Sequence, residues 1–485
     1  MRARHGGAFG LPRLFLAALL VMKPGVIPGF DGAGLAVETR YHSRFPSTGT
    51  RIAYAEARHL FATLPSARIP GDLRDLTDAQ RAARWPAWLD TRDRAIRDRL
   101  DRGDEDTVLL WMALGTSFTR QPRVIDLIAK APDDGAALVQ GLQARARDFV
   151  VALSSTPPLS DRAAFARQLL QARGVGFATD ADRTRAGQFV IQRFAALLKE
   201  QRTLAERLRA ARQQPDASAA FAARSTLFHD RGLSLDTSLS PNIAIGDALE
   251  AIRARDLLAP AAVRRAAVIG PGLDFADKDS GFDFYAIQTL QPFALYEMLL
   301  RLGLADRASL GVTAFDLSPR VHQHLTAARD RAARGEPYPV VLPMDQRVWT
   351  DAVVAFWKGF GDRIGQPAAA PATPPGLALQ VRAVRIDPPV VRRIIPADLN
   401  VIVERADGEP FDLMVATNVL VYYDVFEQAL ALANLASMLR PGGLLLTNTA
   451  LPELSGSRMK AAGSSTTAYS DRPGDGDHIV WYRRD

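Results

Sequence analysis

A glycine turn, an acidic strand end and a second glycine-rich turn, all in the last third of the chain, restrict the fold more than any other feature of the sequence. Gly270-Pro271-Gly272 follows an apolar run at 266–269, and Asp316 ends a second apolar run at 312–316. Further along, the run Leu-Arg-Pro-Gly-Gly at 439–443 leads into the apolar residues 444–446. Such positions at the ends of buried strands are typical of a pocket for a nucleotide-type ligand along the carboxyl edge of a parallel sheet. The C-terminal part is therefore predicted to be α/β.

The length and charge of the chain limit the number of domains and the kinds of partner. The chain has 485 residues, more than one core normally supports, so at least two domains are predicted. The net charge of +7 comes mostly from arginine, because only six of the 60 basic residues are lysine. Acidic residues alternate with the arginines, as in 92–99, and this mixed pattern argues against a nucleic-acid partner. The absence of cysteine excludes disulfides and thiolate metal sites.

Residues 1–36 form a leader-like or disordered N-terminus. Basic residues precede an apolar run at 14–22, as in a secretory leader. A misassigned start codon or a short surface helix explains the pattern equally well. The run is shorter than the roughly 20 residues that a membrane-spanning helix needs, and no other segment is longer and as apolar, so no integral membrane domain is expected.

Residues 37–240 are predicted to form a mainly α-helical N-terminal domain. Apolar residues recur there at three- and four-residue spacing, and the run 107–114 is apolar on all sides. Stripes of this kind are more typical of a core than of a cofactor site. No motif in the region indicates its role.

Residues 241–485 are predicted to form the second domain. A helix begins near Pro241, a Trp-containing helix at 349–357 is inserted, and a linker rich in proline and alanine follows, so that the insertion and linker cover about 337–377. The predicted elements of the sheet and its covering are strands at 266–269, 379–386 and 411–418, a helix at 319–334, and a terminal hairpin at 465–469 and 478–482.

The glycine turn and Asp316 carry the first candidate chemistry. Glycines at 270 and 272 allow backbone N–H groups to approach a ligand closely, although a lone Gly-x-Gly is often only a structural turn. Asp274 would repel a pyrophosphate and suits an amine-bearing ligand instead. Asp316 is placed to accept hydrogen bonds from ribose hydroxyls. It also suits the N-cap of the following helix, and the two roles are compatible.

The remaining candidates follow later strands. Asp398 suits an adenine amino group, and a plain turn explains it equally well. Asn418 can both donate and accept hydrogen bonds, as a zwitterionic amino-acid tail requires. Tyr422 and Tyr423 are candidate substrate residues, with packing of the next helix as the alternative for Tyr423. The histidines at 322 and 324 point to different faces of a helix and make a poor metal pair, so no metal is expected.

In these motifs the region from about 243 to 485 resembles the class I S-adenosylmethionine-dependent methyltransferases. The strongest part is the run 411–423, which is similar to the fourth strand of the chemotaxis-receptor methyltransferases, followed by the turn at 439–443. The resemblance implies a Rossmann-like seven-stranded sheet that ends in an antiparallel hairpin. It implies S-adenosylmethionine as cofactor, with contacts from Gly270, Pro271, Gly272, Asp274, Asp316, Leu317, Asp398, Leu399, Thr417 and Asn418.

The chain departs from the family at Asp274, which stands where many members have a third glycine. It also lacks the Asn/Asp-Pro-Pro-Tyr/Phe motif of enzymes that methylate amino groups of nucleic acids. The resemblance therefore indicates methyl transfer to an unidentified small molecule or protein, with no residue assigned as a catalytic base. The alternatives are an NAD(P)-binding oxidoreductase and an inactive methyltransferase-like scaffold. The cofactor is a cytoplasmic metabolite, which favours the cytoplasm, whereas the leader-like N-terminus is compatible with export.

Overall fold

The computed structural model describes residues 49–130, 134–212, 232–234, 236–237, 239–277, 281–375, 377–448, 450–451, 457–472 and 474–485. The leader-like segment 1–36 lies outside these ranges. Within them, no helix has both the length and the apolar character needed to cross a membrane.

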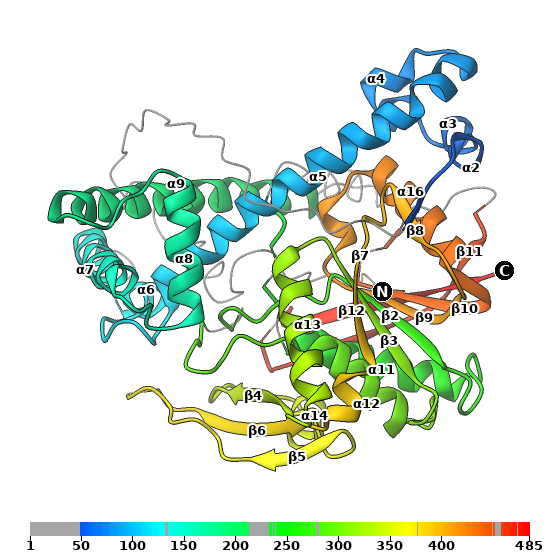
Figure 1. The fold of residues 1–485 in the computed structure, drawn as a ribbon. Coiled ribbons are helices and arrows are strands. Elements are labelled where there is room, and N and C mark those ends of the chain that lie inside the picture. The colour runs from blue at the N-terminus through cyan, green and yellow to red at the C-terminus, as the bar shows by residue number, and fades with distance from the viewer. Residues whose placement is uncertain are drawn as a thin grey trace.

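A seven-stranded mixed sheet forms the centre of the C-terminal half (Figure 1). Its central strands are parallel, and the last two strands of the chain form an antiparallel hairpin at one edge. This arrangement confirms the predicted Rossmann-like sheet. The order across the sheet is β11 (Met459–Ala468), β12 (Gly476–Arg484), β10 (Leu439–Thr447), β9 (Phe411–Ala416), β2 (Arg265–Ile269), β3 (Gly311–Asp316) and β7 (Ile394–Asp398).

Successive residues of the central strands enter different cores, because side chains alternate between the two faces of a sheet. On one face, Val268 and Val415 pack with helices α11 (Ser240–Ala254), α12 (Gln291–Arg301) and α13 (Pro319–Ala333). On the other face, Ile269 and Met414 pack with α16 (Val425–Met438). Both faces are covered, which explains why these strands are apolar throughout.

The N-terminal region is helical, as predicted, and its longest element is α5 (Asp78–Leu114). Thr77 and Gln80 form a capping box at the start of α5. The other elements are β1 (Gly49–Arg51), α2 (Tyr54–Ala57), α3 (Leu60–Thr63), η1 (Ser66–Arg68), α4 (Gly71–Arg74), α6 (Val124–Lys130), α7 (Gly135–Ser154), α8 (Asp161–Ala172) and α9 (Asp180–Arg212).

Helix α5 belongs to two cores. In its first half, Trp85 and Trp88 pack in the same cluster as Phe426 of α16, whereas residues 108–114 pack with α7, α8 and α9. Strand β1 pairs with β8 (Glu404–Ala406) of the C-terminal half. The core therefore crosses the boundary near residue 240 that the sequence predicts, and Figure 1 shows α5 running from α4 to the bundle of α6–α9.

The insertion contains more regular structure than the sequence indicates. Strands β4 (Tyr338–Met344), β6 (Gln380–Ile386) and β5 (Gly365–Ala368) form a separate antiparallel sheet, which accompanies helix α14 (Asp351–Gly359). The expected place of the strand at 379–386 in the main sheet was wrong, because β7, which ends at Asp398, occupies that place. The alternating pattern of 379–386 marks a sheet with one exposed face, unlike the continuous apolar runs of the central strands. Part of the predicted linker is strand β5.

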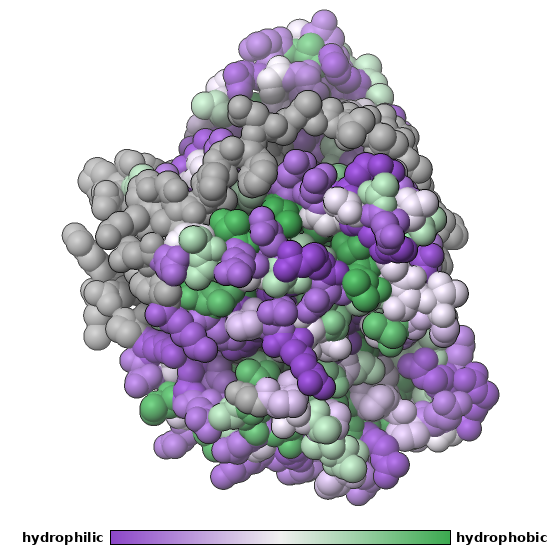
Figure 2. Space-filling view, turned by 90° about the vertical axis from the view of Figure 1, so that its left-hand side faces the viewer, coloured by the Kyte–Doolittle hydropathy of each residue, from purple (hydrophilic) through white to green (hydrophobic). Residues whose placement is uncertain are grey.

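The residues that are coloured in Figure 2 show no concentrated apolar face on the side in view. Hydrophilic residues cover most of that side, and hydrophobic residues are scattered among them. Scattered apolar residues of this kind are normal on a folded surface and do not by themselves mark a docking site.

Candidate functional site

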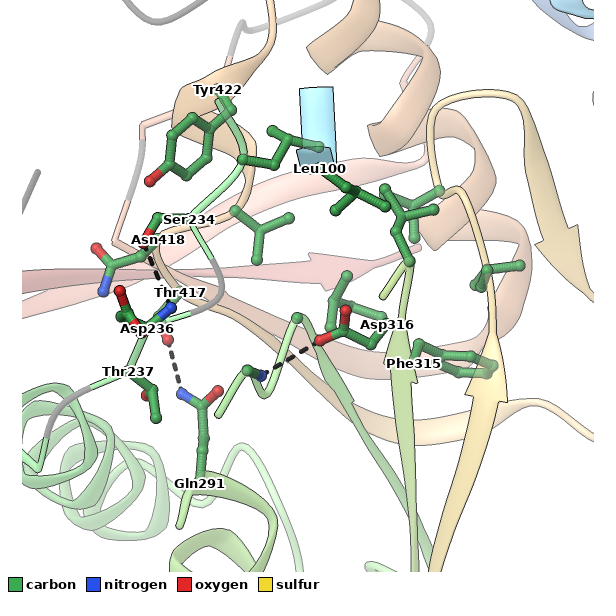
Figure 3. A pocket seen from close by; sticks show the side chains of 18 of the residues that line it. Leu100, Ser234, Asp236, Thr237, Gln291, Phe315, Asp316, Thr417, Asn418 and Tyr422 are labelled. Carbon is green, nitrogen blue, oxygen red and sulfur yellow. Dashed lines mark hydrogen bonds between the residues drawn. The ribbon is translucent and has the colours of Figure 1, made fainter. Parts of the chain in front are cut away.

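A pocket opens at the carboxyl ends of strands β2, β3 and β9, where the sequence places its glycine turn and acidic strand end. It encloses about 860 Å³ of space, a volume that includes its open mouth. Helix α5 contributes Leu100 to the wall, and Leu233, Ser234, Asp236 and Thr237 also line the pocket. Figure 3 shows side chains from both halves of the chain around the same cavity.

The backbone geometry of the turn at the floor of this pocket requires glycine. Gly270 and Gly272 both have a φ of 65°, in the left-handed region that favours glycine. A Cβ atom on Gly270 would lie 2.5 Å from Cγ2 of Val419, in the loop after β9. The turn therefore needs glycine at 270 both for its backbone conformation and for its close approach to that loop.

Asp316 joins the turn to the next strand. Its Oδ2 accepts a hydrogen bond from the N–H of Gly272 at 3.3 Å, and its Oδ1 accepts one from the N–H of Ser318 at 2.8 Å. Burial raises the pKa of the Asp316 carboxyl. The N-cap of α13 is Ser318, so the expected N-cap role of Asp316 was wrong, although its carboxylate does bond to the backbone at that helix start.

Polar side chains fix the end of β9 at the opposite wall. The side chain of Gln291 donates to Oγ1 of Thr417 at 2.7 Å. Asn418 has a φ of 59°, its N–H donates to Oδ1 of Asn448 at 2.8 Å, and its Oδ1 accepts from Nδ2 of Asn448 at 2.6 Å. Asparagine tolerates the left-handed conformation better than most residues. The predicted pair at 417 and 418 therefore lines the pocket in a fixed position.

Tyr422 and Tyr423 both line the pocket, and helix α5 holds them. The guanidinium of Arg99 donates to the carbonyl oxygen of Tyr422 at 2.9 Å and lies 5.8 Å from the centroid of the Tyr423 ring. Burial raises the pKa of the Tyr423 hydroxyl, so it stays protonated at neutral pH.

Two of the predicted acidic residues and Pro271 do not line the pocket, whereas Leu317 and Leu399 do. Asp274 accepts hydrogen bonds from Tyr285 at 3.0 Å and from Gln288 at 2.9 Å, both from the stretch 276–288 that follows the glycine turn. Burial raises the pKa of Asp274 to about 6. The structure thus directs this carboxylate into the protein, away from the ligand amine that the sequence suggested.

Asp398 is likewise engaged elsewhere. Its two oxygens accept hydrogen bonds from the guanidinium of Arg97 on α5, at 3.0 and 2.9 Å. This bidentate ion pair holds the carboxylate against α5, and Asp398 is not among the residues that line the pocket. Asp398 therefore anchors α5 to the sheet.

Sequence reasoning missed the part of the pocket wall formed by Leu233, Ser234, Asp236 and Thr237. Thr237 donates its N–H to the carbonyl of Leu273 beside the glycine turn, at 3.2 Å, and Asp236 accepts a hydrogen bond from Oγ1 of Thr107 at 2.8 Å. The short run Ser-Leu-Asp-Thr has no periodicity, and its only local signal is its position just before the helix that begins near Pro241. Its position at the pocket depends on long-range contacts.

The electrostatic character of the pocket is acidic. Among the described residues that line it, Asp236 and Asp316 are the acidic ones, and lysine, arginine and histidine are absent. A cationic or neutral ligand is therefore favoured over a polyanion. In the part of the chain that the structure covers, no three His, Cys, Asp or Glu side chains are grouped in a way that could hold a metal ion.

No protein-family model and no curated protein sequence matches the chain. Solved methyltransferase structures do match it. The N-methyltransferase NodS from Bradyrhizobium japonicum WM9 is 15% identical, with a TM-score of 0.25, over 50% of this chain and 97% of NodS. Magnesium protoporphyrin IX methyltransferase from Synechocystis PCC 6803, with bound S-adenosylmethionine, is 9% identical, with a TM-score of 0.24, over 58% of this chain and 90% of its own. The glycopeptide N-methyltransferase MtfA is 11% identical, with a TM-score of 0.26, over 52% of this chain and 93% of its own.

Proposed function

We propose that the protein transfers a methyl group from S-adenosylmethionine to an acceptor. The observation that carries this proposal is the hydrogen bond between Gly272 and Asp316 at the carboxyl edge of the sheet. It places a close-approach backbone turn beside a carboxylate, inside a pocket whose described lining is acidic and holds no cation. A ligand with ribose hydroxyls and a positive charge suits this combination.

The residues present fit the parts of this cofactor. Gly270 and Gly272 line the pocket, and because they have no side chains a ligand can approach their backbone closely. Asp316 would accept from the ribose hydroxyls, and the buried side chains of Leu100, Leu399 and Val401 offer apolar contact to a flat base. Thr417 and Asn418 would face the amino-acid tail. When bound, the cofactor supplies an electrophilic methyl group on a sulfonium, and the chain's part is to orient it against the acceptor.

The sequence also suggested a dinucleotide, and the structure gives reasons to rank it lower. A dinucleotide fingerprint has its glycine turn opening directly into a helix. Here residues 273 and 274 after the turn form isolated bridges, and the next helix is α12, which begins at Gln291. The pyrophosphate of NAD(P) would also lie in a pocket with two acidic residues. The third alternative, an inactive scaffold, differs from a methyltransferase in lacking catalysis. It therefore needs a test separate from the geometry of the pocket.

Calorimetric titration tests the proposal. We expect S-adenosylhomocysteine to bind the full chain with micromolar affinity, and NAD and NADP not to bind. Asp316→Ala removes the two acceptor oxygens, and because one hydrogen bond to a charged group contributes about 1.5–3 kcal/mol, we expect at least tenfold weaker binding. Asp330→Ala, at an exposed position of helix α13, which follows Asp316 in the chain, is the matched control and should bind normally.

The outcomes separate the three functions. Dinucleotide binding would overturn the methyltransferase assignment, and equal affinity of Asp316→Ala and the native chain would overturn the assigned pocket. Binding of neither ligand would favour the scaffold. After binding is established, release of labelled methyl from the cofactor in the presence of candidate acceptors would distinguish an enzyme from a binding protein.

A further inference from the structure

The pocket has a buried apolar end and a more accessible polar end. At the apolar end, Leu100, Phe315 and Leu399 are each no more than 3% exposed. At the polar end, Asp236 and Asn418 are only partly buried. Figure 3 shows Asp236, Asn418 and Tyr422 on the side of the cavity opposite Phe315 and Asp316. A second reactant that enters after the cofactor would therefore meet the polar end first.

Asp236 is fixed at this end from two directions. Its Oδ2 accepts a hydrogen bond from Thr107 of α5 at 2.8 Å, and its backbone forms a bridge with Leu273, next to the glycine turn. The N–H of Asp236 also donates to Oγ of Ser234 at 3.3 Å. The carboxylate is thus held in the wall of the pocket by contacts from both halves of the chain, so it is already positioned before any ligand binds.

The charge of the lining determines which acceptors fit. A carboxylate or phosphate acceptor would enter beside Asp236 and Asp316, and no cationic side chain of the described lining would pair with it. Burial of an unpaired anion beside like charges is strongly unfavourable. An amine has the opposite preference, because its N–H groups donate to a carboxylate and its charged form is attracted to one.

On the basis of the proposed methyl transfer, we propose that the acceptor is an amine bound at the polar end by Asp236. The neutral amine donates an N–H to the carboxylate while its lone pair attacks the methyl carbon. The N–C bond forms as the S–C bond breaks, and the bonding electron pair stays on sulfur. The positive charge moves from sulfur to nitrogen, so the product is a methylammonium paired with Asp236, and the carboxylate stabilises the charge that develops there.

Two cofactor analogues test this without knowledge of the acceptor. Sinefungin has the structure of S-adenosylhomocysteine with the sulfur replaced by a carbon that bears a primary amine, so at neutral pH it places an ammonium near the position of methyl transfer. We expect the full chain to bind sinefungin at least tenfold more tightly than S-adenosylhomocysteine. Asp236→Asn should lose this preference, with less than a threefold change in affinity for S-adenosylhomocysteine. Asp330→Asn is the control.

The variant Thr107→Val gives a second measurement, because it removes the hydrogen bond to Asp236 and leaves its charge in place. We expect a partial loss of the preference for sinefungin. The proposal is overturned if Asp236→Asn keeps the full preference, or if it weakens both analogues by the same factor, which would place Asp236 against the amino-acid tail. Failure of the native chain to bind S-adenosylhomocysteine would instead reject the methyltransferase function, and this proposal with it.

Discussion

The ion pair between Arg97 and Asp398 connects the helical region to the edge of the pocket, and its removal has a predictable cost. Arg97 makes two hydrogen bonds to Asp398 and one, at 3.0 Å, to Asp93. The side chains are 14%, 4% and 6% exposed, respectively. In Arg97→Met the methylenes remain, but two buried carboxylates lose a cationic partner.

The expected destabilisation follows from this geometry. Removal of one partner of a buried ion pair costs about 3–5 kcal/mol, because the other charge is left uncompensated. We therefore expect Arg97→Met to lower the free energy of unfolding by about 4 kcal/mol. The double variant Arg97→Met/Asp398→Leu should lose less, since an apolar replacement of a buried pair is often close to neutral. Cofactor affinity should fall in the single variant, because Leu399, next to Asp398, lines the pocket.

Urea unfolding followed by circular dichroism measures the effect. With a slope of about 3 kcal/mol per molar, the midpoint should fall by about 1 M. Arg94→Met, at an exposed position of the same helix, is the control and should change it little. An unchanged midpoint in Arg97→Met, or a double variant as unstable as the single one, would refute the reasoning.

Two further predictions concern the pocket wall and the buried carboxylate. Gly103→Ala should cost about 1–3 kcal/mol and weaken S-adenosylhomocysteine binding, because its Cβ would lie 1.8 Å from the carbonyl oxygen of Leu233. Gly187→Ala, which has open space, is the control, and equal melting temperatures for the two would contradict the prediction. The pKa of Asp274 is raised to about 6, so its contribution to stability is full below about pH 4 and is lost as the pH rises through 6. Asp274→Asn should therefore gain up to about 3 kcal/mol relative to the native chain between pH 4 and pH 8, and a pH-independent difference in urea midpoints would exclude this.

The sequence predicts the central strands well because they are buried on both faces. Strand β9 consists almost wholly of apolar residues, and β2 is apolar from Ala266 onward. The carboxyl ends of parallel strands lie at the same edge of a sheet. The glycine turn, Asp316 and Asn418 each lie at or just after such a strand end, so they lie close together at that edge. The approach of Gly270 to the β9 loop and the bond from Gly272 to Asp316 follow from the same topology.

The rest of the site depends on contacts that no local pattern contains. Arg97 and Asp398 are 301 positions apart in the sequence, and nothing near either residue indicates the other. Asp274 leaves the pocket because Tyr285 and Gln288 bind it, and the pattern of 276–288 suggests only an insertion. Asp236 reaches the pocket through Thr107 and Leu273. These contacts form only when loops and helices that are distant in the sequence pack together in the fold. The spacing of residues along the chain therefore does not predict them.

Helix α5 is 37 residues long, which corresponds to a rod of about 55 Å. Leu100, near its middle, touches the cavity, while one end packs with α16 and the other with α7–α9. The helix therefore connects the wall of the pocket to both packing clusters. Any partner that displaces the outer bundle and moves α5 changes the affinity of the pocket for its ligand, and the ligand then changes the affinity for that partner by the same factor. Helix α5 is therefore the element through which binding at the outer bundle would be linked to binding at the pocket.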